Sequence, residues 1–259
     1  MTTSQPGATP IDPDELAGAP EFPSHRWGFG AFLLVEAVLI ASAAFVSAVL
    51  GDPPAGQPLP IRTVLLGTML PAMIAAGVAL LVTVVRGNGP RLDLRLEWRW
   101  GDVKVGLKFG LLGLVLTSLS AYVWTEIVGS ANATSTISAL VDDRKMSLSA
   151  AIVTFVYLWL VGPICEEIIY RGLLWGAVER MQWRSERWGR VAAFLLSTAV
   201  FAASHLEPLR TTLLLVIAVP IGLARFATGR LAGSVVAHSM NNFLPSAAIL
   251  LSSLGIASF

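Results

Sequence analysis

Long apolar runs, separated by short polar or basic segments, dominate the chain after residue 24. A transmembrane helix needs about 20 consecutive and mostly apolar residues, and each of the longer runs approaches or exceeds that length. The pattern therefore predicts seven spans, at residues 28–50, 63–85, 105–128, 147 to beyond 171, 191–206, 211–226 and 231–254.

Two proline-containing segments modify this pattern. Residues 1–24 hold five prolines and few large apolar side chains. Such a composition buries too little apolar surface to fold, so we expect a disordered tail. Gly162-Pro163 interrupts the fourth run. Because proline lacks the backbone N–H that closes a helical turn, we expect a kink there, and the run forms either one long helix or two.

Composition supports lipid as the main solvent of this chain. Hydrophobic residues make up 54% of it and charged residues 14%, whereas soluble proteins carry about 25% charged residues. The net charge of +1 gives no case for nucleic-acid binding. The predicted partners are therefore the lipid bilayer and whatever peptide or protein reaches the chain within it.

Basic residues cluster in alternate loops of the predicted bundle. They gather after spans two, four and six, at residues 86–104, 180–190 and 225–230, and the last of these loops is assigned both Arg225 and Arg230. Cytoplasmic loops are enriched in Lys and Arg. We therefore expect an integral membrane protein whose N-terminus lies on the cytoplasmic side, together with these three loops.

Two adjacent carboxylates, Glu166 and Glu167, close the apolar run that precedes them. An ionisable side chain costs about 2.5–3.5 kcal/mol at the centre of a membrane helix, so such residues are candidates for function. Glu167 and Arg171 are four residues apart and are expected to pair on one helix face. Glu166 lies roughly 100° around the helix, has no obvious local cation, and suits a general base. The plain alternative is that both carboxylates face a vestibule and serve only solubility or helix pairing.

Two of the three histidines also lie in the apolar C-terminal half. His205 ends the fifth run, and His238 is followed four residues later by Asn242 on the same helix face. A lone histidine in a membrane helix more often forms a hydrogen bond to a neighbouring helix than a catalytic site. Counted along each helix from the nearest basic loop, however, Glu166, His205 and His238 lie roughly 21, 22 and 12 Å deep. They are therefore expected to meet in one cavity.

A carboxylate, two imidazoles and a carboxamide suit hydrolysis. Glu166 and His205 can take a proton from water, while His238 and Asn242 can donate hydrogen bonds to the resulting oxyanion. The same Glu166, His205 and His238 can instead form a zinc site with an open position for water. The chain has no HExxH motif, and the residues leave both alternatives open. Glu36, in the first run, is interpreted as a structural contact rather than a catalytic residue.

These residues resemble the motifs of the CAAX protease and bacteriocin-processing family, which read EExxxR, FxxxH and HxxxN. They stand here, in the same order, as Glu166-Glu167-x-x-x-Arg171, Phe201-x-x-x-His205 and His238-x-x-x-Asn242. The resemblance covers about residues 147–245. It implies an all-α polytopic membrane bundle, often of eight helices where the pattern gives seven. The N-terminal transmembrane helices would occupy residues 25–128 and the catalytic membrane domain residues 147–254.

The resemblance also implies a role for each motif residue. Glu166 and His205 would activate water, His238 and Asn242 would lie near the oxyanion, and Glu167 and Arg171 would shape the site. Eukaryotic members cut prenylated tails. The family is commonly described as metalloproteases, and a glutamate-type mechanism without metal has also been argued for it. We therefore expect an intramembrane endopeptidase of either type in a bacterial plasma membrane, with zinc as its possible cofactor.

Two other classes of function compete with the peptidase. A membrane scaffold or a bacteriocin-immunity protein would bind a peptide partner without cleaving it. A small transporter would use Glu166 as a proton relay, although that reading gives no reason for the histidine and asparagine at four-residue spacing.

Overall fold

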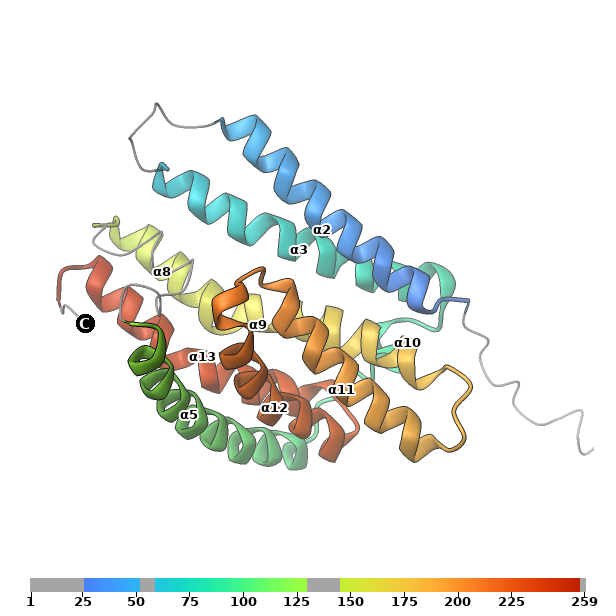
Figure 1. Cartoon of the computed structure of the whole chain (residues 1–259). Helices are drawn as coiled ribbons and strands as arrows, with labels where there is room; N and C mark the ends of the chain where they lie inside the picture. Colours follow the sequence, from blue (N-terminus) through green and yellow to red (C-terminus); the bar gives the residue numbers. More distant parts are fainter. Residues whose placement is uncertain (1–25, 52–58, 130–144, 257–259) are drawn as a thin grey trace, which may run out of the picture.

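The protein is an all-α membrane helix bundle. The computed structural model describes residues 26–51, 59–129 and 145–256, and every regular element within those ranges is helical (Figure 1). The tail predicted for residues 1–24 lies outside the described residues.

Among the residues that the structure describes, five helices are long and apolar enough to cross a bilayer. They are α2 (Phe29–Leu50), α3 (Ile61–Arg86), α5 (Trp100–Val128), the continuous helix Leu148–Glu179, and the segment Pro208–Thr228 made of the short 3₁₀ turn η3 (Pro208–Arg210) and α12 (Thr211–Thr228). Two more predicted spans are also helical, α11 (Glu186–Ser204) and α13 (Leu231–Ser253). Both are more polar, because α11 begins with charged residues and α13 carries a histidine and two asparagines.

The fourth predicted run is one continuous helix with two wider turns. It comprises α8 (Leu148–Val156), the π-helical η1 (Tyr157–Val161), α9 (Gly162–Glu166), the π-helical η2 (Glu167–Leu174) and α10 (Trp175–Glu179). The Gly162 N–H bonds to the Tyr157 carbonyl, five residues earlier. The chain therefore meets the missing N–H of Pro163 by widening the helix just before it, which is a common form of local distortion, and not by ending the helix.

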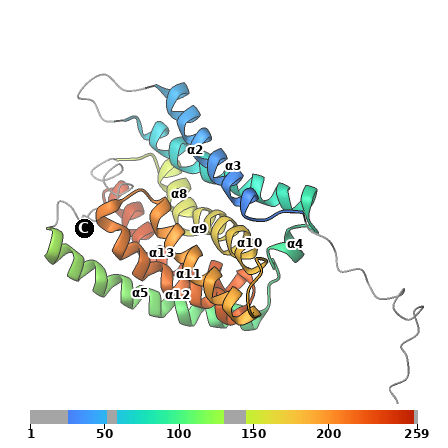
Figure 2. The ribbon, with the colours of Figure 1, turned by 45° about the vertical axis from the view of Figure 1, so that its right-hand side comes forward.

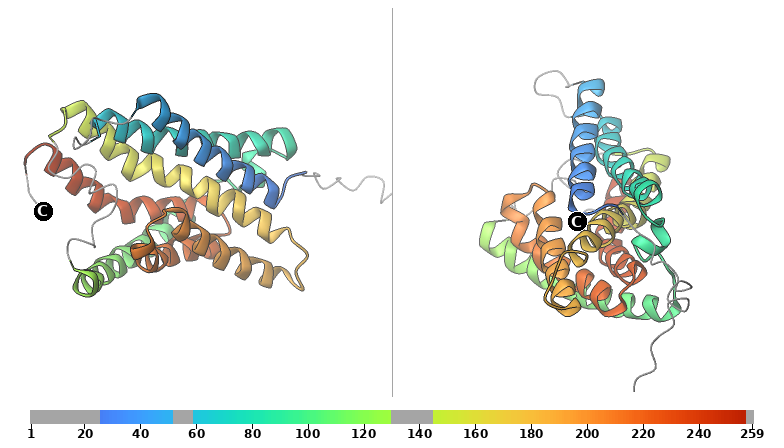
Figure 3. Two further views of the ribbon diagram at one scale, coloured as in Figure 1. Left: turned by 45° about the horizontal axis from the view of Figure 1, so that its top comes forward. Right: turned by 90° about the vertical axis from the view of Figure 1, so that its right-hand side faces the viewer.

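This continuous helix, which we call the central helix, lies between two groups of helices. The α2–α3 pair packs along one side of it (Figures 2 and 3). Helices α11 and α13 pack on its other side, with α12 and α5 behind them. The predicted division at residues 25–128 and 147–254 stays a prediction; within the bundle α5 packs on α12 and α13.

Small residues bring α5 and α13 close together. A Cβ atom added at Gly106 would lie 2.6 Å from the Gly233 carbonyl oxygen, and one added at Gly110 would lie 2.8 Å from the Met240 Cβ. Glycines four residues apart let two membrane helices approach closely enough for backbone contact. The spacing of Gly106 and Gly110 thus holds α13, which carries two of the predicted site residues, against α5.

The end of the bundle that carries the basic loops is held by polar side chains. The Trp27 indole N–H donates to Asp93 Oδ2 at 2.6 Å, and Asn88 donates to the same carboxylate. Asp93 ends the short helix α4 (Pro90–Asp93). Nearby, Arg230 at the start of α13 forms a bidentate pair with Asp102 of α5, at 2.7 and 2.8 Å. The first set of contacts joins the loop after α3 to the start of α2, and the second joins the start of α13 to the start of α5.

Asp93 predicts an acid-dependent loss of stability. Burial by itself raises the pKa of this carboxyl, but hydrogen bonds from Trp27 and Asn88, with the Arg180 charge nearby, outweigh burial and hold the pKa below its usual range. The contribution of Asp93 is therefore present above the unfolded value of about 3.9 and is lost as the pH falls through the lower folded value.

We expect Asp93→Ala to lower the free energy of unfolding by about 1–3 kcal/mol at pH 7, because it removes charge-assisted hydrogen bonds. Unfolding of the detergent-solubilised protein from pH 7 to pH 3 measures the effect. The difference between wild type and variant should shrink below about pH 4. A difference that stays constant throughout this range would show that Asp93 has no lowered pKa.

Candidate intramembrane active site

A cavity of about 430 Å³ opens between the central helix, α11 and α13. Its wall includes Glu166, His205, His238 and Asn242, the four residues predicted to be catalytic. They come from three separate helical segments, and their side chains face one shared space. The structure thus brings together the set that the sequence singled out, while their catalytic roles stay predictions.

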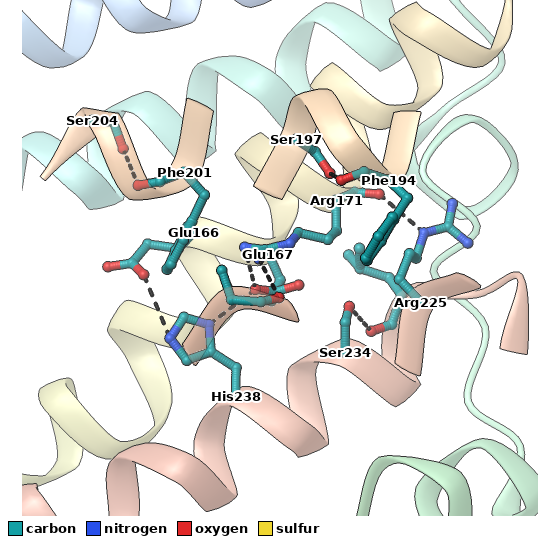
Figure 4. A network of polar contacts seen from close by, with 12 residues as sticks. Glu166, Glu167, Arg171, Phe194, Ser197, Phe201, Ser204, Arg225, Ser234 and His238 are labelled. Atoms are coloured by element: carbon teal, nitrogen blue, oxygen red, sulfur yellow. Dashed lines mark hydrogen bonds and ion pairs between the residues drawn. The ribbon is translucent and has the colours of Figure 1, made fainter. Parts of the chain in front are cut away.

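Glu167 is the centre of a group of buried polar contacts that includes His238 of the cavity wall. Its Oε1 accepts a hydrogen bond from Arg171 Nη1 at 3.0 Å, and both side chains are 0% exposed. The same oxygen lies 2.9 Å from His238 Nδ1 (Figure 4). The predicted pairing of Glu167 with Arg171 is present in the structure. His238 is a further partner, and it links the central helix to α13.

Glu166 occupies a different environment although it is the next residue along the chain. Its side chain is 30% exposed and lines the cavity, and its Oε2 lies 3.6 Å from His238 Nε2. The His238 ring therefore stands between two carboxylates, with Glu167 at one nitrogen and Glu166 at the other. The sequence paired Glu166 with His205; within the described residues its ion-pair contact is to His238.

His205 follows the last turn of α11 and is held through its own helix. Its Nδ1 lies 2.8 Å from the Phe201 carbonyl oxygen. Because a carbonyl only accepts, Nδ1 carries the proton and donates, and in the neutral ring Nε2 is left as an acceptor. His205 thus presents a proton-accepting nitrogen on a residue that lines the same cavity as Glu166.

The Phe201 ring contacts three of the polar residues of the site. From the sequence, Phe201 was known only as the first residue of the FxxxH motif, with no role assigned to it. Its centroid lies 4.8 Å from that of His205 and 5.6 Å from that of His238, and both pairs meet edge to face. The Arg171 guanidinium carbon lies 4.3 Å from the Phe201 ring centroid, within cation–π range. One ring thus touches both histidines and the cation.

Asn242 reaches the central helix with its side-chain amide. Its Nδ2 donates to the Leu158 carbonyl at 3.2 Å, which leaves a second N–H on the same nitrogen. The neighbouring Asn241 is fixed from another helix, because Thr117 of α5 donates to its Oδ1 at 2.9 Å. Sequence spacing gave no sign of the Thr117 contact, since the two residues lie far apart in the chain.

Arg225 corrects one assignment made from the sequence. It was placed in the cytoplasmic loop after the sixth span, yet it lies inside α12 and is 2% exposed. Its Nε donates to the Arg171 carbonyl at 3.0 Å (Figure 4). Its guanidinium carbon lies 5.3 Å from the centroid of the Trp175 ring. The prediction failed because α12 continues to Thr228, so a residue near the helix end still points into the bundle.

A second ion pair lies on the cavity wall and was not singled out by the sequence. The Arg210 Nη1 and Glu207 Oε2 atoms are 2.6 Å apart, and both side chains are largely buried. These residues belong to the turn between α11 and α12. The cavity is therefore charged beyond the motif residues, on the side where α11 ends.

The predicted zinc ligands do not form a metal-binding group here. Across residues 26–51, 59–129 and 145–256, no three side chains of His, Cys, Asp or Glu are arranged to hold a metal ion. Glu166 and His238 lie in mutual contact, while the contacts of His205 are to Phe201. No reaction step is therefore assigned to a metal, and metal dependence stays a prediction to be measured.

Comparison with known families gives a match over the helices that carry this site. Residues 148–244 match the family model described as type II CAAX prenyl endopeptidase Rce1-like. Residues 148–244 form an Rce1-like domain. The Rce1-like domain contains the central helix, α11, α12 and the first part of α13, and so all four predicted catalytic residues. The family resemblance inferred from the motifs is confirmed. Comparisons with curated proteins and with solved structures found no significant match.

The buried pair of Glu167 and Arg171 predicts an asymmetric mutational response. Arg171→Met leaves the Glu167 charge buried without its guanidinium, so we expect a loss of about 3–5 kcal/mol in the free energy of unfolding. The double variant Glu167→Gln, Arg171→Met removes both charges and should recover part of that loss. Unfolding of the purified protein in mixed detergent measures both. A double variant as unstable as the sum of its single variants would show that the two side chains do not interact.

Proposed function

We propose that this protein is an intramembrane endopeptidase that hydrolyses peptide bonds of membrane-associated peptides or proteins. Its Rce1-like domain supports membership of a CAAX-type protease family in general. The observation that carries the proposal is the position of Glu166. This carboxylate faces a cavity beside an imidazole, while the adjacent Glu167 is 0% exposed and its Oε1 contacts Arg171 and His238.

In the proposed reaction, Glu166 accepts a proton from a water molecule in the cavity as the water oxygen attacks the scissile carbonyl. His205 holds this water through a hydrogen bond to Nε2, since its Nδ1–H donates a hydrogen bond to the Phe201 carbonyl. The new C–O bond forms as the carbonyl π electrons move to its oxygen. When the C–N bond breaks, the proton held by Glu166 passes to the departing amine.

The oxyanion formed in this step needs hydrogen-bond donors. Asn242 Nδ2 provides one donor. One of its two N–H groups donates a hydrogen bond to the Leu158 carbonyl, and the other is left for the oxyanion. His238 provides a second from Nε2 in its doubly protonated form, with Nδ1 donating to Glu167. Such fixed donors stabilise negative charge at the point where it develops. Glu167 and Arg171 serve by holding the His238 ring in place.

The first test is peptide cleavage by the protein reconstituted in lipid vesicles, with prenylated and unmodified peptides as separate substrates. We expect Glu166→Ala and His205→Ala each to lower kcat by 100-fold or more, on the order of a lost general base. Cys165→Ser, next to Glu166, is the matched control and should cleave like wild type. Cleavage that survives both substitutions would remove the proposed site and favour a peptide-binding scaffold.

The second test concerns zinc. If Glu166 and His205 activate water without a metal, cleavage should persist after dialysis against a strong chelator, and the purified active protein should contain far less than one equivalent of metal. Metal analysis and activity are measured on the same preparation. Loss of activity with the chelator, and its return on adding Zn²⁺, would instead show that the reaction depends on a metal, with Glu166, His205 and His238 as the candidate ligands.

A further inference from the structure

One buried amide of the cavity wall has no part in the proposed reaction. Asn241 precedes Asn242 on α13, is 4% exposed and lines the cavity. Its Oδ1 accepts a hydrogen bond from the Thr117 hydroxyl of α5 at 2.9 Å. A carboxamide has an acceptor oxygen and, on its nitrogen, two separate donors. The contact with Thr117 therefore occupies the oxygen of Asn241 and leaves its N–H groups for another partner.

The Thr117 hydroxyl leaves its own helix to make this contact. Thr68 and Thr125 show the usual arrangement in a helix, since each donates to the carbonyl four residues earlier in the same helix, at 2.8 Å. Helix α5 lies close to α13 at this point, because a Cβ atom added at Gly113, one turn before Thr117, would lie 3.3 Å from Asn241 Oδ1. Close packing thus lets the hydroxyl of Thr117 fix the orientation of a side chain on α13.

The two N–H groups of Asn241 Nδ2 are left for the cavity. This nitrogen donates to no other residue within 26–51, 59–129 and 145–256, and it is not one of the buried polar atoms there that lack a partner. It therefore borders open space, and the space that Asn241 lines is the cavity of the candidate site. Because an amide N–H without an acceptor costs free energy, donors fixed in such a wall mark a place where a ligand's acceptor binds.

The position of Asn241 relative to His238 indicates which acceptor it meets. The two residues are three apart on α13, so they share a face of the helix with Cβ atoms about 5–6 Å apart. His238 is a proposed donor to the oxyanion. Successive residues of an extended peptide are about 3.3 Å apart, so an acceptor at Asn241 belongs one or two residues from the scissile carbonyl. The main-chain carbonyl is the acceptor that every peptide offers there.

We propose that Asn241 binds a main-chain carbonyl of an extended peptide substrate, one or two residues from the scissile bond, and that Thr117 is the positioning residue that turns the Asn241 N–H groups into the cavity. The inference rests on the proposed peptidase function. Because the backbone of the substrate is recognised, peptides of different sequence are held in the same register. The Rce1-like domain supplies the amide, and α5, which lies outside that domain, orients it.

Asn241→Ala and Thr117→Val test the proposal in the vesicle cleavage assay. Each should raise KM about three- to tenfold, the range expected for one hydrogen bond, while kcat stays within about twofold because the contact is already made in the bound substrate. Thr117→Ser keeps the hydroxyl and should have the KM of the wild type. Thr125→Val is the matched control on α5, since the Thr125 hydroxyl bonds to its own helix.

A second arm changes the substrate and separates a substrate contact from a merely structural role. Peptides are prepared with one thioamide in place of one backbone amide, at successive positions on both sides of the scissile bond. Sulfur is a weak acceptor, so a thioamide at one position within two residues of that bond should raise the KM of the wild type by a similar factor. Asn241→Ala should be insensitive to the same thioamide, because its contact is already lost.

The proposal is overturned by wild-type KM in Asn241→Ala. It is also overturned by thioamide effects that are equal in the wild type and in Asn241→Ala at every position, as a structural role would give. Equal rises of KM in Thr117→Val and Thr117→Ser would show that the Thr117 hydroxyl does not orient the amide.

Binding measurements keep this inference apart from the proposed function. Fluorescence anisotropy gives the Kd of dye-labelled forms of the same peptides for Glu166→Ala and for the double variant Glu166→Ala, Asn241→Ala. If the wild type cleaves no peptide, the proposed function fails, and a Kd that is three- to tenfold higher in the double variant still supports the role of Asn241. Equal Kd values, or no binding of any peptide, would overturn it.

Discussion

The buried pairing of Glu167 with Arg171 is the constraint on which the site depends. Removing two charges from water costs several kcal/mol per ion, and attraction repays that cost only with good geometry and further hydrogen bonds. Here the 3.0 Å pair adds His238 on the carboxylate side and the Ala218 carbonyl on the guanidinium side. Arg225 then caps the Arg171 carbonyl. The buried Glu167 carboxylate, which needs partners in the interior, thus also orients the His238 ring.

Two adjacent glutamates take different roles because the central helix gives them different surroundings. Glu167 begins the wider η2 turns, whose residues are all buried, while Glu166 ends α9 and faces the cavity. Identical carboxyl groups can serve as a fixed structural charge and as a reactive base when their environments differ in this way. Pro163 assists, since the widened turn before it lets the helix continue through the membrane to both residues.

Local spacing explains most of what the sequence predicted, and tertiary packing explains what it missed. The Glu167–Arg171 pair was predicted from the four-residue spacing on one helix. The ionisable motif residues were chosen as candidates because placing them in lipid costs free energy. That Glu166 contacts His238 depends on how α13 crosses the central helix, which no spacing along the chain encodes. The burial of Arg225 depends likewise on which way α12 is rotated in the bundle.

The chemistry of the site also accounts for the polarity of α13. His238, Asn241 and Asn242 reduce the apolar character of a helix that would otherwise read as a strong span. Lipid does not reach the first two, since His238 and Asn241 are buried against the central helix and α5. The glycines of α5 make that possible, because they let α13 approach closely enough to be covered. A polar helix can therefore cross the bundle where the helix next to it carries small residues. The polar side chains that make α13 less apolar are the same ones that the proposed reaction uses as hydrogen-bond donors.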